Sequence, residues 1–562
     1  MENNTELIIS DKRKKIECLI FIGIIILSLV IMFVYMSKKE GWHCDEIFSY
    51  GSSNCYFENT LHPYGPKDST RIFLETKVFT GGIKEVIQNY KYYYIDNRDE
   101  KEEIIDELSK NEIPTWRSRE DAIDYVKAGD NRFNYASVYY NQLRDVHPPL
   151  FYMLVHTVSS VFNNTFSKYI IFFVSIPFFI GTCYFIRKIL VLIDRRDISL
   201  IAVALYAFSM GAISTVMFQR MYVMLSFFTV VYLYLHLLIK NNNYDTTPKI
   251  RKLLILTTVL GFLTQYYFCI YALFIVIIMS ILLIIKKKYK ELFKYLRSIV
   301  ISAFIGVLIF PFSISHIFFS YRGVSSFGNE NYFDRLHEFI GFIIDGFSSN
   351  NMIALAMIVL IFFSYFIKRK NRLDLFSLLA IPVIAYVMVI AQIAPFIELR
   401  YIMNILPIMA MIFTILLSEM FENKVYNALI ALVATVLISI YGLIMTKPLF
   451  LYEGYQEYID ISEEYSEDSL VFVGYTNFNH IQSIPEFMNY KQSLIISKEQ
   501  LDLTKNNEVL EESSEFILIV NKYLGNEEVL NTIMSNTGYD HYEILKDDIV
   551  EGVDNIVYRI YR

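Results

Sequence analysis

The feature that most constrains this chain is a series of apolar segments, each long enough to cross a lipid bilayer as a helix. A hydrocarbon core about 30 Å thick requires roughly 20 apolar residues per helix. The 562 residues are 54% hydrophobic and only 19% charged, with a mean hydropathy of +0.36, which excludes an ordinary soluble globular protein. We therefore expect an α-helical polytopic membrane protein with about eleven spans. The expected spans are 17–36, 169–193, 199–218, 222–239, 253–265, 268–285, 298–318, 350–367, 375–394, 401–419 and 425–445.

Lysine and arginine clusters predict which loops face the cytoplasm, because cytoplasmic loops carry an excess of both residues. The clusters lie at 12–15, 187–196, 240–252, 286–297 and 368–372. This rule places residues 1–16 in the cytoplasm as an N-terminus before an uncleaved first span. It places residues 38–147, a long first loop, and the C-terminal segment on the extracytoplasmic side. We expect segment 149–163 to be a short helix that enters the membrane from that side.

Two regions outside the apolar segments have the composition of folded soluble structure. In the outer loop, residues 100–110 have helical periodicity, and Ser118 begins a second helix with a capping-box pattern. Residues 452–562 alternate short β-rich runs with helical stretches, which predicts a small extracytoplasmic α/β domain beside a transmembrane domain of residues 17–445. Cys44 and Cys55 both fall in the outer loop and could pair if that face is oxidising.

Two adjacent acids, Asp45 and Glu46, follow the first expected span by about nine residues. A carboxylate there can act as a general base for an acceptor hydroxyl, or bind a hard divalent cation. A divalent cation is therefore a candidate cofactor, with Asp45 and Glu46 as its ligands. The alternative is an ordinary solvated pair of loop acids.

A histidine stands before two prolines at the start of an apolar segment, in the sequence Asp145-Val146-His147-Pro148-Pro149. The prolines fix the backbone that enters this segment. They therefore hold the imidazole of His147 in a defined position at the membrane interface, where it can contact a phosphate. The alternative is a proline-marked helix start with an incidental histidine.

Arg220 and Arg400 each lie at the expected outer end of an apolar helix. An arginine in a membrane segment is costly unless it is paired or hydrated, and its planar guanidinium suits phosphate oxygens. The alternative is that both side chains extend towards lipid headgroups. Neighbouring polar residues are candidates for lining the same cavity, although interfacial packing also explains the aromatic ones. These residues are Tyr222, Gln265, Tyr266, Glu398 and Tyr401.

The order of these motifs resembles a known family. Asp-Glu follows the first span, Asp-x-His-Pro-Pro-Leu-x-Tyr ends the long loop, Gln-Arg-Met-Tyr opens a later span, and Arg-Tyr precedes a late span. This order is similar to the type C glycosyltransferases of the protein-mannosyltransferase and aminoarabinose-transferase superfamily, glycosyltransferase family 39 and its bacterial relatives. The resemblance covers roughly residues 17–445.

The resemblance implies a glycosyltransferase that moves a single sugar from a polyprenyl phosphate to an acceptor on the outer membrane face, with inversion. It implies that Asp45 is the general base or the group that orients the acceptor, and that His147 contacts the donor phosphate. Some members of the family have a lysine at the position that corresponds to His147. Arg220 and Arg400 would stabilise the charge that grows on the leaving phosphate.

The acceptor would be a protein, a lipid or a polymer of the cell envelope, and no basic block suggests nucleic acid. A lipid or glycan transporter remains an alternative, since it would share the spans and the interfacial arginines. A polyprenyl-linked glycan ligase is a further alternative.

Overall fold

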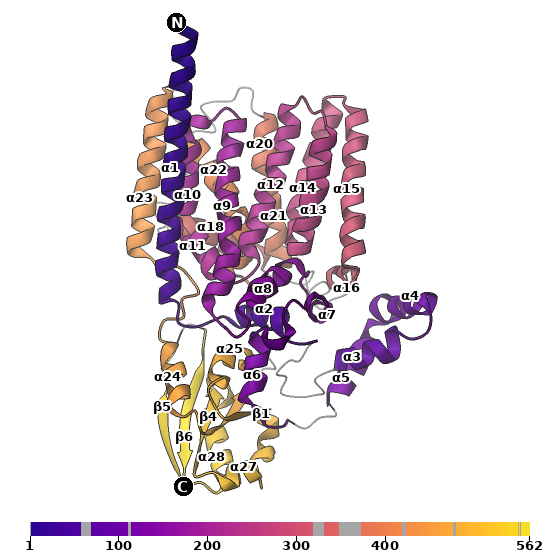
Figure 1. Cartoon of the computed structure of the whole chain (residues 1–562), viewed down its shortest axis with the longest axis vertical. Helices are drawn as coiled ribbons and strands as arrows, with labels where there is room; N and C mark the ends of the chain where they lie inside the picture. Colours follow the sequence, from indigo (N-terminus) through magenta and orange to yellow (C-terminus); the bar gives the residue numbers. More distant parts are fainter. Residues whose placement is uncertain are drawn as a thin grey trace. The chain divides into compact units, whose positions relative to one another are not determined.

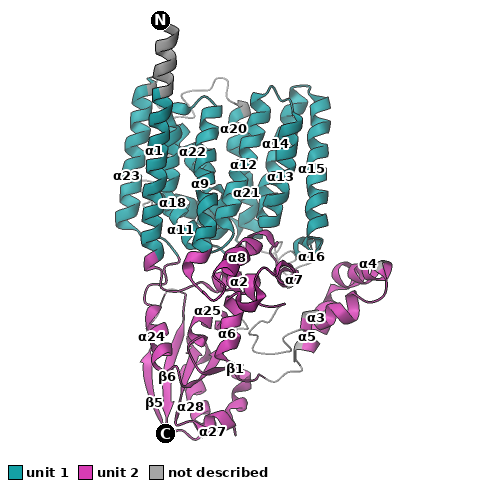
Figure 2. Cartoon of the chain, in the orientation of Figure 1, with its two compact units in different colours: residues 1–36, 171–449 teal, residues 37–170, 450–562 magenta. Residues whose placement is uncertain are grey.

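The computed structural model describes residues 2–57, 69–110, 114–318, 331–347, 373–418, 423–475, 479–548, 550 and 552–562. The chain divides into two compact units, one of residues 1–36 and 171–449 and the other of residues 37–170 and 450–562 (Figure 2). The first unit is built of apolar helices. The second joins the long first loop to the C-terminal segment.

Long helices make up the first unit (Figure 1). Among the described residues, six helices are long and apolar enough to cross a membrane, or seven if a pair bent by 51° is one broken span. The six lie in α1 (Glu2–Lys38), α9 (Lys168–Leu192), α12 (Tyr222–Asn241), α14 (Tyr267–Ile285), α15 (Tyr289–Ile309) and α23 (Lys424–Met445). The bent pair is α10 (Ser199–Ala207), with the short turn before it, and α11 (Met210–Met217).

Shorter helices account for the other expected spans. They are α13 (Pro248–Thr264), α20 (Leu373–Leu379), α21 (Ile381–Ile393) and α22 (Leu406–Leu417), whereas α18 (Tyr332–Phe347) is a further helix that no expected span covers. Every apolar run expected from the sequence falls on a helix except 350–367, which lies outside the described residues. The run expected at 298–318 is shifted, because α15 begins at Tyr289 inside the preceding basic cluster.

Burial separates central from peripheral helices within this unit. In α12, 78% of the apolar window is buried, whereas in α15 the share is 22% and in α1 it is 17%. Short connections make α12, α13, α14 and α15 successive antiparallel neighbours. The turns before α12 and between α13 and α14 therefore lie at one end of these helices, and the turns after α12 and α14 lie at the other.

Ion pairs connect the basic clusters at the end of the helices that carries the turns after α12 and α14. Glu17 pairs with Arg187 at 3.2 Å and with Arg196 at 2.8 Å, which brings the start of α1 to the α9–α10 connection. Lys288 pairs with Asp245 at 3.0 Å, which joins the connections after α12 and α14. The cluster at 368–372 lies outside the described residues.

The second unit contains a six-stranded sheet in the order β1-β3-β2-β4-β6-β5. The expected β-rich runs form β2 (Ser469–Gly474), β3 (Gln492–Ser497), β4 (Glu515–Asn521) and β6 (Asn555–Tyr561). Strands β3, β2 and β4 are parallel neighbours, and β6 pairs antiparallel with β4. The expected helix at 526–534 is α28 (Asn526–Thr537).

Two strands of this sheet were not expected from the sequence. One is β5 (His541–Lys546), which pairs with β6. The other is β1 (Arg117–Ser118), which comes from the first loop and pairs antiparallel with β3. The first loop thus contributes to the C-terminal sheet, and Arg119 reinforces the join by donating to the carbonyl oxygens of Tyr490 and Ser466.

The first loop is mostly helical. The expected helix at 100–110 is α5 (Arg98–Lys110), and Ser118 caps α6 (Arg119–Val126) through the expected capping box. Further helices are α2 (Cys44–Asn54), α3 (Ser69–Phe73), α4 (Ile83–Lys91), α7 (Tyr135–Arg144) and α8 (Leu150–Val161). The expected short helix at 149–163 is α8, whose twelve residues are too few to cross a bilayer.

Candidate active site

The acid pair lies in the first turn of α2. His43 is the N-cap: its Nδ1 accepts from the backbone N–H of Asp45 at 3.1 Å, and its own N–H donates to Glu46 Oε2 at 2.7 Å. Side chains that accept from the free N–H groups of a first helical turn stabilise the helix start. The helix therefore begins at this point, because the His43 side chain satisfies the N–H of Asp45 and the Glu46 side chain satisfies the N–H of His43.

The two acids have different surroundings. The Glu46 side chain is fully buried, and its carboxylate pairs with the Lys39 ammonium at 3.0 Å. The Asp45 side chain is 24% exposed. Asp45 is thus the acid of the pair with access to solvent.

The remaining surface of α2 packs closely on neighbouring helices of the same unit. Gly51 lies against the ring of Tyr125 in α6, where a Cβ would come within 2.1 Å of Cζ, so only glycine fits. Asn54 donates to the carbonyl oxygen of Val126 at 2.7 Å and to Ser159 Oγ of α8 at 3.2 Å. These contacts fix the C-terminal part of α2.

Three consecutive side chains at the start of α2 offer a mixed set of metal-ligand atoms. One ligand atom from each of His43, Cys44 and Asp45 lies within 4.8 Å of the others. Nitrogen and sulfur ligands suit zinc better than magnesium, which prefers oxygen. Asp45 and Glu46 were the expected cation ligands. The Glu46 carboxylate is already paired with the Lys39 ammonium, so a cation would compete with Lys39 for it.

Cys44 and Cys55 are not joined by a disulfide in the structure. Cys44 begins α2 and Cys55 is its C-cap, so eleven residues of helix separate them. At 1.5 Å per residue this is roughly 16 Å, whereas the Cα atoms of a disulfide lie about 4.4–6.8 Å apart. This conformation therefore excludes the pairing that the sequence left open.

His147 is held by an aspartate two residues earlier. Its Nδ1 lies 2.9 Å from Asp145 Oδ2, and the Tyr152 hydroxyl donates to the same oxygen at 3.4 Å. The other oxygen of Asp145 accepts from the backbone N–H of Val146 at 2.7 Å. Pro149 then caps α8. The expected rigid entry is present, and Asp145 orients the imidazole through Nδ1.

The expected arginines are buried at helix ends of the first unit. Arg220 is 2% exposed, in the turn between α11 and α12, and Tyr222 begins α12 with 3% exposure. Arg400 is 6% exposed and pairs with Glu398 at 2.9 Å, with its guanidinium 5.2 Å from the ring centre of Tyr401. Burial of both guanidiniums argues against side chains that simply extend into lipid headgroups.

Aromatic contacts connect some of the other expected residues. The ring of Tyr401 meets that of Tyr267 edge-on at 5.4 Å, which brings the turn before α22 to the start of α14. Ser226 of α12 donates to the carbonyl oxygen of Met403 at 3.2 Å, which brings α12 to the same region.

Gln265 and Tyr266 form a smaller group beside this region. The side-chain oxygen of Gln265 accepts from the Tyr266 N–H at 2.6 Å, and the Tyr266 hydroxyl lies 3.1 Å from His316 Nδ1 of α16 (Ser313–Phe318).

Sequence reasoning missed Lys39, His43, Asp145 and His316. Asp145 could have been identified from the sequence, because it stands two residues before the expected histidine. His43 could also have been identified, because it occupies the N-cap position before two acids. No sequence pattern marks Lys39 or His316, since only the packing of the folded chain brings each of them to its partner.

Comparison with solved structures identifies the fold. A crystal structure of ArnT from Cupriavidus metallidurans bound to undecaprenyl phosphate matches with a TM-score of 0.52 and 10% sequence identity, over 96% of this chain and 97% of that chain. The chain has a type C glycosyltransferase fold. The expectation drawn from motif order is confirmed at this level, including the helical membrane class with a small C-terminal sheet.

The apo form of the same ArnT also aligns, with a TM-score of 0.47 and 9% identity over 77% of this chain and 93% of that chain. No family model and no curated protein sequence matches this chain. The likeness of this chain to ArnT therefore lies in three-dimensional shape rather than in sequence, at 10% identity and a TM-score of 0.52.

Proposed function

We propose that this protein is a membrane glycosyltransferase that moves one sugar from a polyprenyl-phosphate donor to an acceptor on the extracytoplasmic face, with inversion. The observation that carries the proposal is the type C fold, which extends over 96% of the chain. The matching ArnT structure holds undecaprenyl phosphate, a lipid of the expected donor class.

In this proposal Asp45 is the general base. A base must have access to the acceptor hydroxyl, and Asp45 is the partly exposed acid of the pair. It would remove the acceptor proton on the face of the sugar opposite the leaving phosphate, as inverting glycosyl transfer requires.

Arg220, Arg400 and His147 would contact the donor phosphate. A guanidinium can donate two hydrogen bonds to phosphate oxygens, and the charge on these oxygens increases as the glycosidic bond breaks. The Asp145 carboxylate would keep the His147 ring oriented for that contact.

The test supplies membranes that contain the protein with radiolabelled polyprenyl-phosphate sugars of different sugar identity. We expect one of them to be consumed, and Asp45→Asn to reduce turnover at least about tenfold, which corresponds to about 1.4 kcal/mol. The matched control is Asp99→Asn, at an exposed aspartate of α5. If no polyprenyl-phosphate sugar is consumed, the proposal is wrong. If Asp45→Asn retains the turnover of the control, the assignment of the base is wrong.

A further inference from the structure

A fully buried lysine lies in the segment that leads to the acid pair. The side chains of Lys39 and Glu46 are both 0% exposed, and the Lys39 ammonium lies 3.0 Å and 3.2 Å from the two oxygens of Glu46. Lysine is almost never fully buried unless it is paired, because removing its charge from water is costly. The next residue back, Lys38, is exposed in the ordinary way. Lys39 therefore has a specific role in the fold of this segment.

The C-terminal segment completes the surroundings of this ammonium. The carbonyl oxygen of Phe450 accepts a hydrogen bond from Lys39 Nζ, and the ring centre of Tyr452 lies 5.0 Å from it. Phe450 and Tyr452 have φ angles of 70° and 54°, a left-handed region that residues other than glycine rarely adopt. Such a backbone persists only where its surroundings demand it. The bend brings a carbonyl oxygen and an aromatic ring to Lys39.

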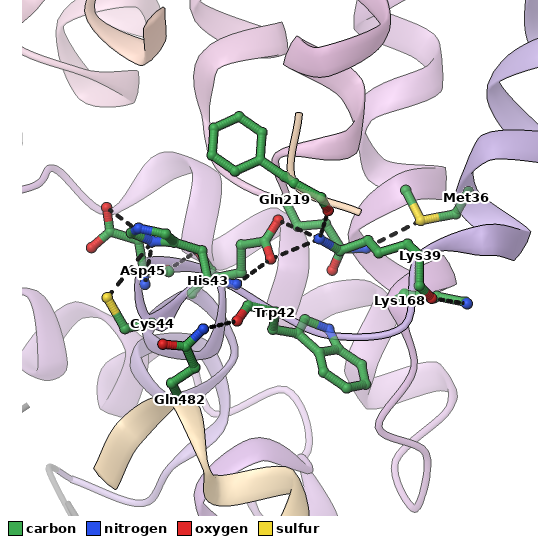
Figure 3. Close-up of polar contacts among 12 residues, drawn as sticks. Met36, Lys39, Trp42, His43, Cys44, Asp45, Lys168, Gln219 and Gln482 are labelled. Atoms are coloured by element: carbon green, nitrogen blue, oxygen red, sulfur yellow. Dashed lines mark hydrogen bonds and ion pairs between the residues drawn. The ribbon is translucent and has the colours of Figure 1, made fainter. Parts of the chain in front are cut away.

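Three more contacts hold the residues between Lys39 and the acid pair. The backbone N–H of Glu40 donates to Leu451 at 2.9 Å, and the Glu40 carboxylate accepts from the N–H of Gly454 at 2.6 Å. Gln482 donates to the carbonyl oxygen of Trp42 at 2.9 Å (Figure 3). The C-terminal segment thus fixes the backbone up to the start of α2.

Glu46 transmits this restraint to Asp45. Its Oε2, which lies 3.0 Å from the Lys39 ammonium, also accepts from the N–H of His43 at 2.7 Å. His43 Nδ1 in turn accepts from the N–H of Asp45 at 3.1 Å. A continuous series of bonds therefore runs from the buried ammonium to the backbone of the proposed base.

We propose that Lys39 is a positioning residue for Asp45, and that Glu46 is the counter-ion through which it acts rather than a second catalytic acid. The proposal rests on the proposed function, in which Asp45 is the base. It also assigns the C-terminal segment a part in the active site, since Phe450 and Tyr452 complete the environment of Lys39.

The test compares Lys39→Met, Glu46→Gln, the double variant and Lys38→Met as the matched control at an exposed lysine. One readout is donor turnover, resolved into kcat and KM. The other needs no activity: it is the rate at which a maleimide labels Cys44, which begins α2 and is half-buried. Peptide mass spectrometry measures this rate in the purified full chain, without removing the other cysteines.

We expect each single variant to lower kcat about tenfold or more with little change in donor KM, because breaking a buried pair leaves one charge uncompensated. Cys44 should label faster in both single variants. The double variant should recover most of kcat and the slow labelling, since the introduced amide oxygen can still accept from the His43 N–H. Lys38→Met should match the wild type.

Two results would overturn the proposal. If the double variant is as inactive as Glu46→Gln, while its Cys44 labelling has returned to the wild-type rate, the Glu46 carboxylate acts directly. If Lys39→Met matches the wild type in both readouts, Lys39 positions nothing. If the wild type consumes no donor, the proposed function is wrong. Cys44 labelling would then still decide whether Lys39 and Glu46 hold α2 in place.

Discussion

At the scale of single residues, adjacent positions with similar chemistry have different environments. Asp45 and Glu46 are consecutive carboxylates, yet one is partly exposed and the other is fully buried against Lys39. A helix turns about 100° per residue, so consecutive side chains point in different directions. The role of each acid therefore depends on the side of α2 that it occupies.

The buried arginines lead to a prediction about donor use. Charge-assisted hydrogen bonds contribute about 1.5–3 kcal/mol each, so Arg220→Ala and Arg400→Ala should each weaken donor use about tenfold or more. Arg→Lys keeps the charge but loses the planar fork, so it should have an intermediate effect. The measurement is kcat/KM for the polyprenyl-phosphate sugar, with Arg297→Ala as the control at an exposed arginine. Near-silent lysine variants at both positions would contradict a phosphate-binding role and would favour the transporter.

Glu486 leads to a prediction about pH. Burial raises the pKa of this carboxyl from 4.5 to about 7, although the Tyr455 hydroxyl donates to it at 2.8 Å. Between these pH values the folded chain binds more protons than the unfolded chain, so stability falls as pH rises through this window. The ionised form costs about 3 kcal/mol at pH 8, taken from the size of the shift.

Glu486→Gln should remove this cost. We expect its midpoint of thermal unfolding in detergent to exceed that of the wild type at pH 8 and to approach it near pH 4.5. Glu463→Gln, at an exposed position, should differ from the wild type at neither pH. A Glu486→Gln effect of equal size at both pH values would show that the carboxyl does not titrate in this range.

At the scale of elements, the join between the first loop and the C-terminal sheet is short but specific. Strand β1 has only two residues, Arg117 and Ser118, and α6 begins directly after it. The Arg119 guanidinium donates to the carbonyl oxygens of Tyr490 at 3.2 Å and Ser466 at 2.6 Å. One side chain thus reinforces a pairing that two strand residues could not hold alone.

Arg119→Ala should therefore loosen this join. Hydrogen bonds from a charged donor suggest a loss of about 1.5–3 kcal/mol in local stability. Hydrogen exchange of the backbone amides in β1 and β3 should become faster, while exchange in β5 and β6 should stay unchanged. Glu120→Ala is the control, at the exposed neighbouring position. Unchanged exchange in β1 would show that the two-residue pairing needs no support from Arg119.

At the scale of the whole molecule, the membrane orientation is the expectation on which the site depends. The basic clusters meet at one end of the first unit, where Lys288 pairs with Asp245 and Glu17 with Arg196. The turns that carry Arg220 and Gln265 lie at the opposite end of the antiparallel helices. This segregation is what the distribution of lysine and arginine predicts for cytoplasmic and extracytoplasmic ends.

Cysteine labelling can test the orientation. In intact cells, a membrane-impermeant maleimide should label Glu463→Cys in the C-terminal segment but not Lys290→Cys at the basic end. Both positions are exposed. Lys290→Cys should label only after permeabilisation, which controls for its reactivity. The reverse pattern would place the candidate site on the cytoplasmic face and would contradict the proposed transfer on the outer face.

The sequence by itself determined the membrane class, the positions of most apolar helices, four strands of the sheet and the order of the motifs. Long apolar windows and β-branched runs are local signals, and a bilayer or a packed sheet leaves them few alternatives. Proline after His147 is equally local, because it restricts the backbone of the residue before it. Each of these features can be predicted from neighbouring residues alone.

Only the tertiary structure decided which acid is buried and which strand completes the sheet. The bond between Lys39 and the carbonyl oxygen of Phe450 joins residues 411 positions apart, and β1 pairs with a strand more than 370 residues away. Such contacts depend on packing between distant segments, and a charge becomes fully buried only when that packing supplies its partner. The sequence therefore predicted where the chemistry lies, while long-range packing determined which side chains hold it in place.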